Sequence, residues 1–281
     1  MNATTMSTAL RAPGANRALR FSVRFWFLVM VIGELLFTLS TVSFYGGAAL
    51  KGDASALKRF MFHGYVAGDT LGNAIVATHI LCAVIINLGG LIQLIPQVRQ
   101  KAPRLHRWVG RVYLTTAAAL SLAGLYITWV RMAGGPFSDQ FGISLDALLI
   151  LTCGFLSLHY ALARQFDRHR RWTLRLFLVA NGSFFFRTGV FFWLAVNQGH
   201  AVGFDVDTFK GPFLTFLSIA ESLLPLTILE FYLRTQASRS QMARYVMAAG
   251  ITLSGLVIGI GVFVLGTAIW IPLILHKPLA F

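Results

Sequence analysis

The sequence predicts an all-α fold, a polytopic integral membrane bundle of about seven transmembrane helices. Of its 281 residues, 56% are hydrophobic and only 12% are charged. Several apolar runs reach about 20 residues, the length that an α-helix needs to cross roughly 30 Å of hydrocarbon. Because helices satisfy their own backbone hydrogen bonds within lipid, each run is interpreted as one helix. The Lys and Arg residues gather in the short loops between these runs.

The elements follow in order along the chain. Residues 1–20 are polar and lack an apolar period, so we expect a disordered cytoplasmic tail. Residues 21–281 are expected to form a single transmembrane helical domain. Its first run, 21–44, is longer than the roughly 7–15 residues of a signal-peptide core, which indicates a retained helix. The other six helices are expected at 73–95, 108–130, 143–162, 172–196, 212–233 and 245–273.

The basic residues set the expected orientation. The formal net charge is +14, but its division among short loops is typical of a topology signal and not of a nucleic-acid surface. With seven crossings, most of the 24 Lys and Arg residues fall on the side of the N-terminus. The positive-inside rule then places the N-terminus in the cytoplasm. The expected partners are the bilayer and its anionic lipids, with no nucleic acid.

Two similar motifs begin the third and fifth predicted helices, at residues 105–114 and 169–178. Each has a His, then an Arg and a Trp, and a further Arg three residues after the Trp. Trp108 and Arg111 therefore share one face of a helix, as do Trp172 and Arg175. The hairpin of the second and third helices and the hairpin of the fourth and fifth helices have the same expected orientation, which indicates a weak internal repeat about an axis along the membrane normal.

The motifs have two interpretations. Trp and Arg at a helix end mark the headgroup level, where Arg side chains extend toward lipid phosphates. Alternatively, the planar guanidinium forks bind one anionic group, such as a lipid headgroup, a quinone headgroup or heme propionates. The predicted function is binding of such a group at the cytoplasmic ends of the third and fifth helices. The candidate ligand-binding residues are His106, Arg107, Trp108, Arg111, Tyr113, His169, Arg171, Trp172 and Arg175.

Four histidines are candidate ligands for heme iron or another metal ion, namely His79, His106, His159 and His169. Histidines inside a bundle can be axial heme ligands. A bis-histidine heme needs two ligands at matching depth, which His106 with His169 or His159 would provide. The alternative function is therefore a heme-binding electron-transfer protein, by fold-level analogy with diheme cytochrome b bundles.

No catalytic residue is assigned from the sequence. It contains no glycine-rich phosphate loop, no Gly-x-Ser-x-Gly elbow and no Cys-x-x-Cys pair. Cys82 and Cys153 fall in apolar runs and are interpreted as buried inert thiols. We therefore do not expect an enzyme, and a membrane oxidoreductase would be the class if there is an activity.

Several polar residues fall inside the predicted helices: Glu34, His79, Gln93, Arg187 and Glu221. A charge at the bilayer centre costs about 2.5–3.5 kcal/mol on insertion scales, so such groups should face the bundle interior and pair. One interpretation is a structural Glu–Arg pair. The other is a small-solute or proton transporter, in which a leftover carboxyl keeps its proton. No short broken helix pair is expected, and Asp146 and Glu230 are placed nearer the surfaces.

Over about residues 74–190, the chain resembles the bacterial predicted-membrane-protein family called domain of unknown function 2306. Thr78-His79, Gly89-Gly90, Gln93 and the two motifs carry the resemblance. One departure is Thr173, where the resemblance implies Met. It implies a bacterial cytoplasmic-membrane protein and no particular reaction. It also implies that these polar positions are the family's signature: His79, Gln93, His106, Arg111, Tyr113, His169, Arg171, Trp172, Arg175 and Arg187.

Overall fold

The computed structural model describes residues 13–53, 56, 64–132 and 137–279. In this part of the chain the secondary structure is helical, apart from an isolated β-bridge between Asp205 and Lys210. The predicted all-α class is confirmed.

Six helical segments are long and apolar enough to cross a membrane, and a bent pair of helices brings the number to seven. The bent pair is α7 (Phe166–Ala180) and α8 (Gly182–Val196), which differ in direction by 51°. Two of the six are extended by a π-helical turn and a short helix: α1 (Pro13–Thr41) by α2 (Gly47–Leu50), and α10 (Gln241–Leu265) by α11 (Ile271–Ile274). The others are α3 (Thr70–Leu94), α5 (Pro103–Trp129), α6 (Phe137–Leu162) and α9 (Pro212–Ala237), and the short α4 (Pro96–Lys101) links α3 to α5. The predicted count of about seven spans is confirmed.

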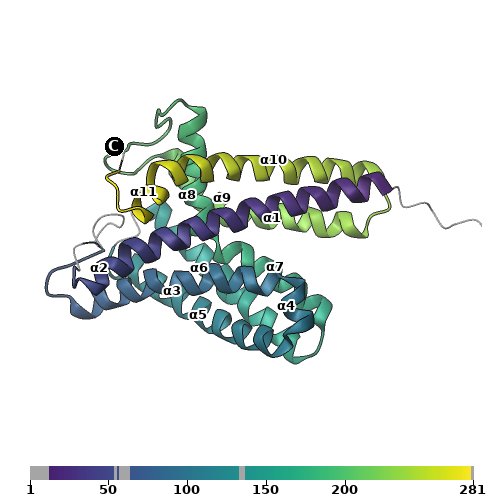
Figure 1. The fold of residues 1–281 in the computed structure, drawn as a ribbon, viewed down its shortest axis with the longest axis horizontal. Helices are drawn as coiled ribbons and strands as arrows, with labels where there is room; N and C mark the ends of the chain where they lie inside the picture. The colour runs from purple at the N-terminus through teal and green to yellow at the C-terminus, as the bar shows by residue number, and fades with distance from the viewer. Residues whose placement is uncertain (1–12, 54–55, 57–63, 133–136, 280–281) are drawn as a thin grey trace, which may run out of the picture.

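The helices form two groups (Figure 1). In one group, α1 packs along α10, and α10 contacts α8 and α9. In the other, α3 packs on α5, α5 on α6, and α6 on α7. α9 contacts α6, α7 and α8, so it joins the groups. We call the side of the bundle where α1 begins the N-side and the opposite side the far side.

The largest buried core lies where the groups meet. Met30 of α1, Phe177 of α7, Phe184 of α8 and Val262 of α10 are each at most 6% exposed and belong to one cluster. Trp270, also in this cluster, stacks on Phe184 with ring centroids 6.2 Å apart. Aromatic rings thus fill the space around the break between α7 and α8.

The expected disordered tail is wrong for residues 13–20, which are the first turns of α1. Pro13 suits the first position of a helix, where its missing N–H breaks no hydrogen bond. Leu19 is buried against Met247 and Ile251 of α10. Residues 13–20 have a polar composition because only one face of these helical turns is apolar. Residues 1–12 lie outside the described residues.

The fifth predicted helix, 172–196, is interrupted at Asn181, so the expectation of no broken helix is also wrong. The Asn181 side chain is 2% exposed, and its Nδ2 donates to the Phe177 carbonyl at 2.8 Å. Such a side chain offers the backbone an alternative to helical hydrogen bonds. The next residue, Gly182, begins α8. The break therefore falls inside the bundle, where protein and not lipid surrounds the interrupted backbone.

Candidate functional site

The first motif copy lies in the first turns of α5 and faces outward. Arg107 and Arg111 are exposed, and Trp108 is 64% exposed. His106 is half-buried, and its carbonyl accepts a hydrogen bond from Gln93 Nε2 of α3 at 2.8 Å. This copy therefore presents two cations at the N-side surface and ties α3 to α5 through its backbone.

Tyr113 does not lie at that surface. It is 4% exposed and packs in a core cluster with Ile86 and Ala117. Gly89 on α3 allows this approach, since a Cβ added there would lie 3.2 Å from the Tyr113 ring. The structure thus separates Tyr113 from the arginines with which the sequence motif groups it.

The second motif copy has a different role for its deeper arginine. Arg175 forms an ion pair with Glu230 of α9, with Nη2 2.6 Å and Nε 2.7 Å from the same carboxylate oxygen. The guanidinium also lies 4.6 Å from the centre of the Trp172 ring. Arg171 stays exposed. Arg175 therefore connects two helices, and its charge already has a carboxylate partner.

An apolar groove of about 520 Å³ runs beside this ion pair. Side chains of α1, α7, α8, α9 and α10 line it, and along α9 the lining extends from Phe216 to Tyr232. These 17 residues span about 24 Å of helix. Most lining residues are apolar, but Arg170 and Tyr232 lie at its N-side end and Glu221 lies toward the far side. The groove thus has the form of a long apolar channel with a polar group near each end.

A second, polar cavity of about 260 Å³ lies between α3, α5, α6, the α7–α8 break and α9. His79, Asn87, Asp146, Ser183 and Glu221 are among the residues that line it. Glu221 lines the groove as well. The side chain of Glu221 is therefore the boundary between the two cavities.

Asp146 is held against the break by two elements. It accepts a hydrogen bond from Ser222 Oγ of α9. On its other side is Gly182, where an added Cβ would lie 3.2 Å from both carboxylate oxygens. Only a residue without a side chain lets the carboxylate come so close to the first turn of α8. The positive end of that helix dipole stabilises a negative charge there.

Three of the lining residues share one depth. His79, Asp146 and Glu221 each lie nine residues after the first residue of their helix, at the far side. This corresponds to a depth of about 14 Å. Asp146 was predicted to lie near the surface because the fourth helix was expected to begin at residue 143, whereas α6 begins at Phe137. The signal that could have found Asp146 is its match in depth to Glu221.

The remaining intramembrane charges are not paired as expected. Arg187 is exposed, donates to the Ser183 carbonyl at 2.8 Å, and lies 5.1 Å from the centre of the Phe37 ring. Glu34 is fully buried on α1. Within the described part of the chain, no ion pair joins Arg187 to Glu34 or to Glu221. The predicted structural Glu–Arg pair is therefore wrong, and Arg175–Glu230 is the pair that the fold uses.

Among the described residues, no group of three or more His, Cys, Asp or Glu side chains is placed to hold a metal ion. His169 Nδ1 lies 2.9 Å from the Ser157 carbonyl, so it carries the proton and Nε2 is left for other partners. His159 is exposed and stacks on Phe155, whereas His79 lines the polar cavity. Heme ligation by two histidines stays a prediction. Cys82 and Cys153 are free thiols.

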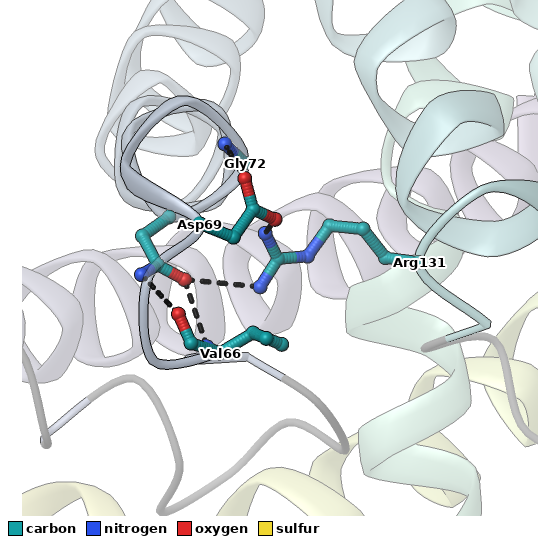
Figure 2. Close-up of polar contacts among 5 residues, drawn as sticks. Val66, Asp69, Gly72 and Arg131 are labelled. Atoms are coloured by element: carbon teal, nitrogen blue, oxygen red, sulfur yellow. Dashed lines mark hydrogen bonds and ion pairs between the residues drawn. The ribbon is translucent and has the colours of Figure 1, made fainter.

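A polar clamp closes the bundle at the far side (Figure 2). Arg131, which follows α5, lies with Nη1 2.5 Å from Asp69 Oδ2 and donates from Nη2 to Asn73 at 3.0 Å. Asp69 caps α3 by accepting from the Gly72 N–H at 2.9 Å. The clamp lies one helical turn beyond Thr128, which lines the polar cavity. It fixes the far-side ends of α3 and α5 against each other.

The loop between α8 and α9 is a second ordered feature of the far side. The Trp193 side chain of α8 donates to the Val202 carbonyl at 2.7 Å. Two hydrogen bonds from Thr208 hold the pKa of the exposed Asp205 carboxyl below its usual value. Local hydrogen bonds thus order this loop, and none of its residues is among the described residues that line the groove or the polar cavity.

Together, the apolar spans, the broken span and the two cavities define a multi-pass helical membrane protein. Residues 76–205 match the model of a family described as predicted membrane protein, DUF2306. The match runs from α3 to the loop after α8, and it confirms the resemblance predicted from the sequence over that part of the chain. No curated protein and no solved structure matches the chain.

Proposed function

We propose that the protein binds an anionic phospholipid, with the acyl chains in the apolar groove and the headgroup at Arg170. The observation that carries this proposal is the groove itself, whose apolar walls lead to an arginine at one end. The proposal places the N-side in the cytoplasm of a bacterium and the bundle in its cytoplasmic membrane, in agreement with the bias of Lys and Arg toward that side.

The walls suit acyl chains. Trp26, Leu178, Phe185 and Ile258 contribute apolar surface from four helices. The groove also borders the lipid-facing surface, because the lining residue Phe216 is 64% exposed. A chain could therefore enter sideways from the bilayer. A bound chain replaces contacts with other lipids, so its retention depends on how closely the walls pack around it.

The headgroup end suits an anion. Arg170 is exposed at the N-side end of α7, and a guanidinium binds two phosphate oxygens at once. The predicted residues Arg107, Arg111 and Arg171 are exposed on the same side and would draw anionic headgroups toward it. Arg175 is less available because Glu230 already neutralises it. We therefore assign the headgroup contact to Arg170 in place of Arg175.

Heme is less well supported in this groove, because no histidine is among the described residues that line it. Quinone would also suit the apolar walls, but it lacks the charge that would favour an arginine at the entrance. An anionic phospholipid uses both the walls and the cation.

The test is native mass spectrometry of the detergent-purified protein after reconstitution with mixed phosphatidylglycerol and phosphatidylcholine. We expect the wild type to retain phosphatidylglycerol preferentially. Arg170→Gln should weaken that retention roughly fivefold, since one cation near a membrane surface contributes about 1 kcal/mol. Gly250→Phe should abolish retention of both lipids, because Gly250 lines the groove and an added Cβ has open space around it.

Two matched variants serve as controls. Arg168→Gln removes the same charge from the same helix, where the guanidinium lies over the Tyr160 ring. Gly47→Phe places the same bulk at another open glycine, on α2. Both should retain the lipid as the wild type does. Equal loss of phosphatidylglycerol in Arg168→Gln and Arg170→Gln would mean that general surface charge, and not a site at Arg170, retains the lipid. Full lipid retention in Gly250→Phe would exclude the groove as the binding site.

A further inference from the structure

The polar cavity brings two carboxylates together inside the membrane. Asp146 of α6 and Glu221 of α9 both line it, and Ser222, the neighbour of Glu221, donates a hydrogen bond to Asp146. Both carboxylates lie at a depth of about 14 Å from the far side. Two negative charges that line one small cavity at this depth would repel each other and would each lose hydration. At least one of them is therefore expected to be neutralised, either by a proton or by another cation.

The surroundings decide which carboxylate stays charged. Asp146 has the Ser222 hydroxyl and the first turn of α8 at Gly182, and both favour a negative charge. Glu221 is 8% exposed, and within the described part of the chain no hydrogen bond reaches its carboxylate. The protein therefore stabilises a negative charge on Asp146 more than one on Glu221, although both carboxylates line the same cavity. Glu221 is the one that needs a counter-ion.

The other charged groups around Glu221 do not supply that counter-ion. On α8, the charge of Arg187 acts on Glu221, but no ion pair joins the two side chains among the described residues. On α3, His79 lines the cavity with a buried Nδ1 that has no hydrogen-bond partner in the described chain. On α7, Arg175 is paired with Glu230, and Arg170 lies at the other end of the groove. The stretch of α10 that lines the groove carries no titratable side chain.

We propose that Glu221 is a proton-binding site in the membrane interior, and that ionised Asp146, held by Ser222 and the start of α8, is its positioning partner. The proton comes from water in the polar cavity, binds one Glu221 carboxylate oxygen, and returns by the same route. No electron moves and no covalent bond between heavy atoms changes. His79, Ser121 and Thr128 line the cavity and provide polar groups for that water. The proposal does not depend on lipid binding in the groove.

The test is infrared spectroscopy of the reconstituted full-length protein in H₂O and D₂O, which separates protonated from ionised carboxyl groups. We expect the wild type to show a protonated-carboxyl band that Glu221→Gln reduces by one carboxyl. Asp146→Asn should keep this band but change its frequency, because the neighbour changes. Glu230→Gln is the matched control, since its carboxylate is held in an ion pair and should be absent from the band.

Each result decides the proposal. An unchanged protonated-carboxyl band in Glu221→Gln would show that Glu221 is ionised. Loss of this band in Asp146→Asn alone would show that Asp146 holds the proton and that Glu221 is its ionised partner. If replacing choline by Na⁺ at constant pH removes the Glu221 band, the site takes Na⁺ in preference to a proton and the proposal is overturned. Should Glu221→Gln fail to give a monodisperse protein, Ser222→Ala is the second variant. It removes a hydrogen bond to Asp146 and should shift the ionised-carboxylate band while the protonated band stays.

Discussion

The groove and the polar cavity lie on opposite sides of Glu221 and are built in different ways. Five helices supply the groove with apolar side chains and with one arginine at its N-side end. The polar cavity, about half the volume, has two carboxylates and a histidine among its lining residues and lies beside a broken helix. The groove therefore suits a molecule that comes from the bilayer, whereas the polar cavity suits water and protons.

The break between α7 and α8 accounts for much of this difference between the two cavities. A continuous helix would place a side chain near Asp146, but Gly182 leaves room for the carboxylate. The same break turns α8 by 51° toward α10, so that Phe184 and Phe185 enter the apolar core. One interruption of the chain thus leaves room for a carboxylate on the polar side of Glu221 and places Phe185 in the wall of the apolar groove on its other side.

The two sides should also differ in what holds them together, and the largest effect is expected at the far-side clamp. Asp69→Ala removes the carboxylate from Arg131, whose side chain is only 3% exposed, and it also removes the cap of α3. Removing one partner of a buried pair costs about 3–5 kcal/mol, and the 37% exposure of the Asp69 side chain favours the low end, about 3 kcal/mol. The measurement is the free energy of unfolding in mixed detergent micelles.

Asp207→Ala is the control for this prediction, because Asp207 is exposed in the loop between α8 and α9. We expect it to change stability by less than about 0.5 kcal/mol. If Asp69→Ala were equally mild, the far-side ion pair would contribute little to holding the helices around the polar cavity.

On the groove side, the equivalent prediction concerns a glycine contact. A Cβ at Gly261 of α10 would overlap the backbone carbonyl of Thr188 on α8. Backbone cannot move aside as a flexible side chain does, so Gly261→Ala should destabilise the protein by about 2 kcal/mol. The same substitution at Gly250, where the added Cβ meets nothing, should be neutral or slightly stabilising. Thermal unfolding of the two variants in one detergent measures the difference.

Apolar length and loop charge were sufficient to predict the helical class and about seven spans, because both depend on local composition. The depth of Asp146 and the break at Asn181 were not predictable in this way. The six additional residues at the start of α6 place Asp146 at the same depth as His79 and Glu221. The Asn181-Gly182 step interrupts the helix where the surrounding protein buries the Asn181 side chain and shields the interrupted backbone from lipid. The repeated motif likewise predicted equal roles for Arg111 and Arg175. Only the tertiary position of Glu230 makes them different.

The smallest expected effect tests that last difference, at the N-side end of the groove. Arg175→Gln leaves Glu230 without its cation, but Glu230 is 39% exposed and can be solvated, so the loss should be about 1 kcal/mol. Arg111→Gln, at the equivalent motif position, removes an exposed arginine outside the ion pairs of the described residues and should change stability by less than about 0.5 kcal/mol. High salt should narrow the gap between the two variants, because screening weakens a half-exposed pair. Equal stabilities at low salt would mean that the Arg175–Glu230 contact contributes nothing to the α7–α9 interface, and the two motif copies would then be equivalent after all.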